Sequence, residues 1–279
     1  MNRIDTHQHL IYPDQLSYDW LAEVPALQAD EFRLEHYHEA AKDCGITSSV
    51  FMEVDVAAEH QPREARLINK LAAEPNSGIL GIVASCRPEV TEFASYLDLI
   101  ETPLLKGLRR VLHVAPDDVS EGELFRSNVR LLGERNLSFD LCLRADQLTL
   151  GTSLIQACPD TQFILDHCGN PDLTGSDLTQ WKNDLSDLAQ HDNVVCKISG
   201  IPVNCPEGGP TAEAIRPAVE TVIELFGWDR VLFGGDWPVC TLNGTLKQWV
   251  DSLDEVLRHE DENKLNKLFS ENAQRIYRL

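Results

Sequence analysis

Near its start the chain reads Asn2-Arg3-Ile4-Asp5-Thr6-His7-Gln8-His9-Leu10, a short strand pattern that ends in two histidines. Side chains two residues apart in a strand project to the same face, so His7 and His9 are predicted to point together, as a metal site or a catalytic polar cluster requires. An apolar strand followed by a polar group and a turn occurs twice more, in Phe163-Ile164-Leu165-Asp166-His167-Cys168-Gly169 and in Val231-Leu232-Phe233-Gly234-Gly235-Asp236-Trp237-Pro238. Three separate strands therefore deliver His or Asp to their ends.

The same alternation runs through the whole chain. Short runs rich in Val, Ile, Leu and Phe alternate with amphipathic, charged stretches, as repeated βα units do. Eight strands are predicted, near residues 3–9, 47–54, 79–85, 105–112, 137–143, 163–168, 194–199 and 230–235. The predicted helices are Phe32–Cys44, Pro62–Ala73, Glu89–Ile100, Glu121–Arg135, Leu148–Ala157, Leu178–Gln190, Thr211–Phe226, Leu246–Leu257 and Glu262–Tyr277. Gly45 and Gly227 each follow a helix, where glycine readily takes the left-handed cap.

Eight strand-helix alternations predict an α/β fold of the closed (β/α)₈ TIM-barrel type rather than an open doubly wound sheet. Polar residues fall near the carboxyl ends of the predicted strands, and in a barrel these ends form one mouth, the usual place for an active site. They are His9, Arg109, His113, Arg144, His167, Lys197 and Asp236. No glycine-rich phosphate loop follows the first strand, which argues against a dinucleotide-binding sheet. No composition break marks a linker, so a single domain over residues 1–279 is expected.

The composition excludes several function classes. With 45 acidic against 24 basic side chains the formal charge is −21, which disfavours nucleic acid and anionic membranes as partners. No apolar run approaches the roughly 20 residues of a membrane helix. The eight cysteines form no Cys-x-x-Cys pair and lie mostly in apolar stretches, which predicts buried, reduced thiols. The first strand begins almost at Met1 and leaves no room for a signal peptide, so a cytoplasmic location is expected.

Motifs along the chain resemble those of the amidohydrolase superfamily, in the branch of lactone hydrolases that includes sugar-acid lactonases and 2-pyrone-4,6-dicarboxylate lactonase. The matching pieces run in the order of that family from residue 4 to residue 277. They are Ile4-Asp5-Thr6-His7-Gln8-His9, Tyr18-Asp19-Trp20-Leu21, Gly107-Leu108-Arg109, Asp166-His167-Cys168-Gly169-Asn170-Pro171, Lys197-Ile198-Ser199-Gly200, Phe233-Gly234-Gly235-Asp236-Trp237-Pro238 and Glu271-Asn272-Ala273-Gln274-Arg275-Ile276-Tyr277. The resemblance implies a barrel that opens a lactone ring.

Lactone hydrolysis needs a positioned water, a base for its proton and electropositive groups where the carbonyl oxygen gains charge. Asp236 is the candidate base because it follows an apolar strand; a helix cap or an ion-pair partner is the alternative for a single strand-end aspartate. We expect Gly234 and Gly235 to let a substrate approach the backbone closely. His7, His9 and His167 would either bind a divalent metal or donate hydrogen bonds to the carbonyl directly, and the sequence does not choose between these roles.

Metal-dependent members of the superfamily have a fuller pattern, with a histidine on the fifth strand and a bridging Lys or Glu on the fourth. The predicted fifth strand here reads Ser138-Phe139-Asp140-Leu141-Cys142-Leu143-Arg144 and contains no histidine, which argues against a two-metal centre. The expectation is therefore either no required cofactor or one zinc ion, held by His7 and His9 with His167 or Asp236.

Arg109 matches the family position that holds the substrate, and a guanidinium suits a carboxylate or the oxygens of a sugar lactone. His113 and Arg144 are further candidates for substrate contact. Trp20 and Trp237 would either line the pocket or pack in the core or a lid. For Lys197, a place near the site and a surface position both remain open.

Taken together, the sequence predicts a hydrolase that opens a sugar-acid (aldono) lactone, such as fuconolactone or rhamnonolactone, with Asp236 as general base. Two alternatives stay open: a metal-dependent, non-oxidative decarboxylase of an aromatic acid, and a non-catalytic barrel that binds a sugar acid. The expected partner is a small-molecule lactone, with no nucleic acid and no membrane. Either a monomer or a homodimer fits the sequence.

Overall fold

A computed structural model describes residues 2–28, 32–175 and 177–279. Eight parallel strands pair in sequence order from β1 to β8, and a bridge between Gln8 and Trp237 joins the last strand region to the first. The strands are β1 (Arg3–Gln8), β2 (Ile46–Met52), β3 (Ile79–Ser85), β4 (Leu105–Val111), β5 (Ser138–Cys142), β6 (Phe163–Leu165), β7 (Val194–Ile198) and β8 (Val231–Phe233). All eight predicted strands are present, and the (β/α)₈ barrel is confirmed.

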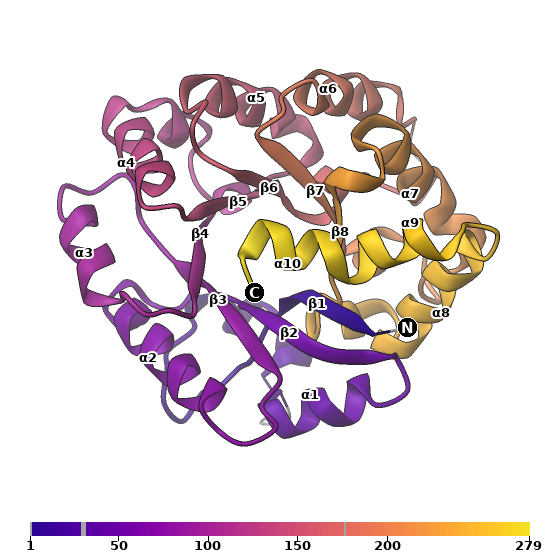
Figure 1. Ribbon diagram of the computed structural model, residues 1–279, viewed down its shortest axis with the longest axis horizontal. Helices are drawn as coiled ribbons and strands as arrows, with labels where there is room; N and C mark the ends of the chain where they lie inside the picture. The colour runs from indigo at the N-terminus through magenta and orange to yellow at the C-terminus, as the bar shows by residue number, and fades with distance from the viewer. Residues whose placement is uncertain (1, 29–31, 176) are drawn as a thin grey trace.

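Helices surround the ring of strands (Figure 1). They are α1 (Leu34–Ala41), α2 (Gln61–Ala72), α3 (Phe93–Leu99), α4 (Glu123–Glu134), α5 (Leu148–Ala157), α6 (Thr179–Ala189), α7 (Ala212–Phe226), α8 (Leu246–Leu257), α9 (Glu262–Asn266) and α10 (Asn272–Tyr277). The single helix predicted over Glu262–Tyr277 is wrong in detail, because a π-helical turn at Lys267–Glu271 separates α9 from α10. None of the helices in the described part of the chain is long and apolar enough to cross a bilayer.

The amino-terminal half of the barrel interior is an apolar plug. Its strand side chains are Ile4, Val50, Met52, Val83, Ile164, Val195 and Leu232. Ile276 and Tyr277 of α10 join this cluster, and Figure 1 shows α10 lying across the middle of the strand ring. A larger apolar layer fills the space between the strands and the outer helices, and it contains most of the cysteines. All eight cysteines are buried and free, as predicted.

Two strands end earlier than predicted. The sequence predicts strands near 163–168 and 230–235, but β6 stops at Leu165 and β8 at Phe233. His167, Cys168 and Asp236 have φ angles of 56°, 56° and 54°, in the left-handed region that cannot continue a strand. Non-glycine residues in this region are strained and are found preferentially at functional sites. At the carboxyl ends of β6 and β8 the backbone therefore leaves the sheet, and its conformation sets the direction of the side chains there.

Candidate active site

Three histidines and one aspartate meet at the carboxyl end of the barrel. The ring centroid of His7 lies 4.8 Å from that of His9 and 4.4 Å from that of His167. Asp236 Oδ1 is 3.4 Å from His9 Nε2 and 3.6 Å from His7 Nε2. All four side chains are almost fully buried. The structure thus brings together the four residues that the sequence singled out at three strand ends; we call them the mouth cluster.

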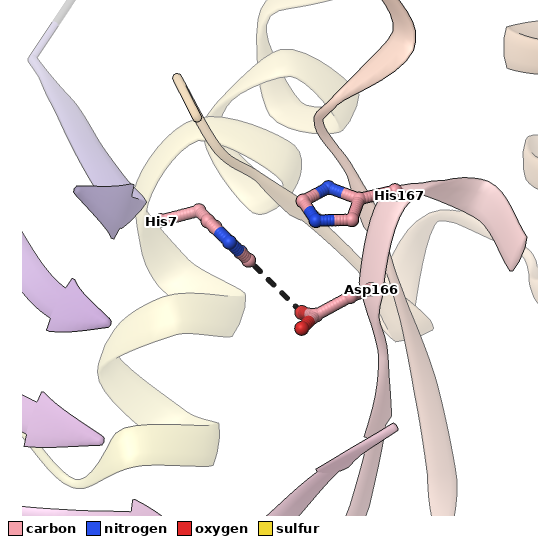
Figure 2. Close-up of side chains that lie close together, drawn as sticks. All are labelled: His7, Asp166 and His167. Atoms are coloured by element: carbon pink, nitrogen blue, oxygen red, sulfur yellow. Dashed lines mark ion pairs between the residues drawn. The ribbon is translucent and has the colours of Figure 1, made fainter. Parts of the chain in front are cut away.

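Local backbone and packing fix His167. It follows β6 in a left-handed turn beside His7 (Figure 2), and its Nδ1 lies 3.0 Å from Ser199 Oγ. Gly200 has a φ of +63°, and a Cβ atom there would lie only 2.2 Å from His167 Nδ1. Gly200 is therefore required both by its backbone conformation and by the space that the imidazole occupies. Burial lowers the pKa of His167, so its ring is uncharged near neutral pH.

His9 is oriented by the neighbouring strand. Its Nδ1 lies 3.0 Å from the backbone carbonyl oxygen of Met52, at the end of β2. A carbonyl oxygen can only accept, so Nδ1 carries the proton and donates it. In neutral His9 the lone pair of Nε2 then faces Asp236, which is the orientation seen in histidines that bind a metal or accept a proton.

His7 has a cation and a carboxylate at each ring nitrogen. Its Nδ1 lies 3.2 Å from Lys197 Nζ and 3.4 Å from Asp166 Oδ1, the contact drawn in Figure 2. Its Nε2 lies 3.3 Å from an Arg109 nitrogen and 3.6 Å from Asp236 Oδ1. Burial lowers the pKa of His7 well below its ordinary value. The ring is therefore neutral, and the surrounding charges decide which nitrogen holds its single proton.

A layer of buried charges supports the mouth cluster from below. Lys197 Nζ lies 2.8 Å from Asp140 Oδ2 and 2.9 Å from Asp166 Oδ1, and Arg109 Nε lies 2.5 Å from Glu53 Oε1. Burial raises the pKa of Asp140 to about 6 although Lys197 opposes it. Burial also acts to raise the pKa of Asp166, but Lys197 and His7 outweigh it and hold that pKa well below the usual range. We call these five residues the charged layer.

The three polar residues predicted to contact the substrate differ in how deeply they are buried. Arg109 is only 5% exposed and donates to Glu53, so most of its hydrogen-bonding capacity is directed inward. His113 is half-buried, with its Nδ1 3.1 Å from Cys142 Sγ, and burial lowers its pKa to about 4. Arg144 is more exposed and donates to the backbone oxygen of His113.

The two tryptophans do not both line the mouth. Trp237 is 4% exposed, and its ring packs against Phe32 and Tyr37 with centroid distances of 5.6 Å each, so it belongs to the core next to α1. Trp20 is partly exposed and donates to the backbone oxygen of Val54 beyond β2. Of the two, Trp20 has the larger exposed surface.

The role expected for Gly234 and Gly235 is wrong. A Cβ at Gly234 would lie 2.7 Å from His7 Cβ and 2.8 Å from Ser199 Cβ, and one at Gly235 would lie 2.4 Å from Asp5 Oδ2. Side chains of the protein fill the space beside these glycines. They permit close packing of strands β1, β7 and β8 rather than close approach of a substrate.

Among the residues that the structure describes, two groups of side chains have ligand atoms close enough to hold one metal ion. One comprises His7, Asp166 and His167, but the charged layer places Lys197 at 2.9 Å and Arg109 at 3.3 Å from the Asp166 carboxylate, where a divalent ion would be repelled.

The second group comprises His7, His9 and Asp236. Two imidazoles and one carboxylate are ordinary ligands of a single zinc ion, and the Met52 carbonyl already orients His9 for this role. The residues present therefore fit one divalent ion at this group, with Arg109 3.3 Å from His7 Nε2 as a competing cation.

A sequence profile of the amidohydrolase family matches residues 4–279. The chain belongs to the amidohydrolase family. It is 26% identical over 295 residues to the uncharacterized protein y4mH of Sinorhizobium fredii, an alignment that covers 99% of this chain and 98% of that protein. It is 23% identical over 269 residues to an L-fucono-1,5-lactonase of Burkholderia multivorans, with 90% of this chain and 89% of the relative covered.

Among solved structures, an amidohydrolase from Burkholderia multivorans with bound zinc superposes with a TM-score of 0.88 at 23% identity, and the match covers both chains completely. The two proteins therefore share the whole barrel fold.

Sequence reasoning missed most of the charged layer. It predicted that Arg109 contacts the substrate and did not decide whether Lys197 lies near the site or at the surface. It assigned no role to Glu53, Asp140 or Asp166. Each of these carboxylates lies at or near the end of an apolar strand and is fully buried. The available signal was an acidic residue within such a strand, because a charge at that position is buried only when it has a partner.

Proposed function

We propose that this amidohydrolase hydrolyses the ester bond of a lactone, with Asp236 as general base. The observation that carries the proposal is the pairing of Asp236 Oδ1 with His9 Nε2 at 3.4 Å, in a buried site at the barrel mouth. Both atoms are acceptors when His9 is neutral, since its Nδ1 donates to Met52. A water that donates one hydrogen to each of them directs an oxygen lone pair away from both, toward a bound carbonyl carbon.

The reaction then balances on the chain's own residues. The water oxygen forms a bond to the acyl carbon while Asp236 takes the water proton. His7 and His167, which lie beside this position, donate hydrogen bonds to the carbonyl oxygen as it gains charge. When the bond between the acyl carbon and the ring oxygen breaks, Asp236 returns the proton to that oxygen, and the product is an open-chain hydroxy acid.

The charge balance at the mouth favours an uncharged substrate. Each arginine at or after the ends of β3, β4 and β5 has a carboxylate partner within hydrogen-bond distance. The pairs are Arg87 with Asp55, Arg109 with Glu53, Arg110 with Glu89 and Arg144 with Asp117. A substrate with two carboxylates would have to displace these partners and would face Asp236 as well. A neutral sugar lactone meets no such penalty.

Among neutral lactones we propose an aldonolactone such as fuconolactone or rhamnonolactone. The name of the Burkholderia multivorans relative supports this class. His113 follows β4, Arg144 follows β5, and Trp20 donates to the Val54 carbonyl beyond β2; their groups suit the hydroxyls and the ring of a sugar. We propose them, with Arg109, as the residues that determine substrate preference.

We further propose that hydrolysis does not require a metal. A divalent ion, when bound by His7, His9 and Asp236, would supply extra polarisation of the carbonyl group. The proton transfers assigned to Asp236 use only side chains of this chain.

The test is a pH-indicator assay of the purified protein on a panel of aldonolactones and on 2-pyrone-4,6-dicarboxylate, each with and without chelator. The proposal predicts turnover of a neutral aldonolactone that persists after chelation and little turnover of the dicarboxylate. Carbon dioxide release from an aromatic acid, only with an added divalent ion and without lactone turnover, would instead establish the decarboxylase. Binding of a sugar acid without any turnover would establish the non-catalytic barrel.

A further inference from the structure

Lys197 lies inside the barrel, where an ammonium group has no access to water. Its side chain is fully buried in β7. The Nζ atom donates to Asp140 Oδ2 at 2.8 Å, lies 3.2 Å from His7 Nδ1, and forms an ion pair with Asp166 Oδ1 at 2.9 Å. An ammonium group has donors only, so a nitrogen that it contacts at hydrogen-bond distance must present a lone pair to it.

We infer that Lys197 is a positioning residue that sets the tautomer of His7. By donating to His7 Nδ1 it keeps that nitrogen unprotonated, and the single proton of the neutral imidazole is then on Nε2. His7 Nε2 faces Asp236 at the mouth. Lys197 is fully buried and acts through His7. The inference rests on the proposed lactone hydrolysis for its functional consequence, but not for the tautomer itself.

The opposite tautomer would set two donors against each other. If Nδ1 carried the proton, its N–H would face the Lys197 ammonium at 3.2 Å, and Lys197 would lose this hydrogen bond. Two buried donors that face each other are unfavourable. The inferred tautomer still leaves Arg109 with an acceptor. Its Nη1 atom, which lies 3.3 Å from His7 Nε2, is also 3.3 Å from Asp166 Oδ2.

The placement of this proton matters for the reaction. In the metal-free enzyme, His9 presents a lone pair to the site, so it cannot donate to the carbonyl oxygen while neutral. His7 Nε2 with a proton can donate, and Lys197 is the group that makes this donor available. An imidazole held in the wrong tautomer keeps its position but loses the hydrogen bond that stabilises the developing oxyanion.

The direct test is nitrogen-15 NMR of histidine-labelled, chelator-treated protein, in which the two nitrogen shifts of an imidazole report which one is protonated. The signals of His7 are assigned by their loss in His7→Gln. We expect a protonated Nε2 in the wild type. In Lys197→Met we expect the proton on Nδ1, donated to Asp166. A proton on Nδ1 in the wild type would overturn the inference.

The kinetic test separates positioning from mere stabilisation. Lys197→Met alone leaves two carboxylates short of a cation and can fail to fold, so it is paired with Lys197→Met/Asp140→Asn. The double variant removes one positive and one negative charge, which leaves the net charge of the charged layer unchanged. We expect it to melt close to the wild-type temperature, with kcat lowered about 100-fold and KM changed less than about threefold.

Lys106→Met is the matched control, because Lys106 is a strand lysine on β4 whose Nζ binds the backbone oxygen of Arg278, away from the mouth. It should retain wild-type kcat. Wild-type kcat in the folded double variant would show that Lys197 is purely structural and would overturn the inference. If wild-type protein opens no lactone, the proposed function fails, and the NMR comparison still decides the tautomer.

Discussion

The two halves of the barrel interior are built from the same eight strands but have opposite chemistry. The amino-terminal half is an apolar plug closed by Ile276 and Tyr277 of α10. The carboxyl-terminal half holds the charged layer and, above it, the mouth cluster, all almost fully buried. The difference lies in which side chains the strands direct inward along their length.

The two halves of the barrel interior contribute differently to the stability of the fold. Burial of the plug removes apolar surface from water and stabilises the barrel. Burial of charges is costly, and a buried ion pair is often no more stabilising than apolar residues of the same shape. The charged layer is therefore best explained by what it does for the mouth cluster. Variants in the two halves should separate activity from stability.

The largest expected effect is the loss of activity in Asp236→Asn. The amide has nearly the same shape but cannot accept the water proton, so kcat should fall about 1000-fold or more. The melting temperature should change little or rise, because a partly desolvated carboxylate is replaced by a neutral group. Steady-state kinetics and thermal unfolding of the same preparation check both parts. Loss of activity together with a large fall in stability would mean that Asp236 acts chiefly as a structural partner.

Gly200→Ala should lower activity by a smaller factor than Asp236→Asn does. The new Cβ would overlap the His167 ring, so the ring must move, and kcat should fall about 100-fold. Gly78→Ala is the matched control: its φ is +72°, but a Cβ there meets only ordinary contacts at 3.6 Å and beyond, at the opposite end of the barrel. Both variants should lose about 1 kcal/mol from the left-handed backbone. Equal kcat values in the two variants would contradict the role assigned to His167.

Ile276→Ala should show the reverse pattern in the apolar plug. Truncation of a buried isoleucine leaves a cavity and should lower the free energy of unfolding by about 2 kcal/mol or more. The kcat on the best lactone should stay within about twofold of the wild type, because Ile276 of α10 lies in the plug at the opposite end of the barrel interior from the mouth cluster. Denaturant unfolding and steady-state kinetics are the measurements. A large drop in the kcat of the fully folded Ile276→Ala variant would show that the apolar plug affects catalysis at the mouth cluster.

The smallest expected effect is a pH-dependent stability difference in His113→Gln. The folded pKa of His113 is lowered to about 4 by burial and by nearby Arg109, whereas the unfolded value is about 6.5. Between these values the unfolded chain binds a proton that the folded chain does not, so this histidine costs stability as the pH falls. The free energy of unfolding of the wild type, relative to the variant, should drop by about 2 kcal/mol between pH 7 and pH 4. A pH-independent difference would contradict the burial of this ring.

The sequence predicted the barrel and the mouth cluster because both depend on local patterns. Apolar strands that end in His or Asp mark the mouth, and each of them can be found without knowing its neighbours. The charged layer depends on pairs such as Lys197 with Asp140, which lie on different strands, so their contact follows only from barrel closure. The left-handed turn at His167 is also not visible in a strand pattern. The core position of Trp237 likewise depends on how α1 packs against the barrel.

The central claim is that a water, activated by Asp236, attacks the acyl carbon of a lactone. The most direct measurement is mass spectrometry of the product formed by chelator-treated wild-type protein in oxygen-18 water. One oxygen-18 atom per turnover in the product carboxylate is the predicted result, because attack at the acyl carbon places the water oxygen there. Oxygen-18 in the alcohol group, or a product that has lost carbon dioxide, would contradict the claim.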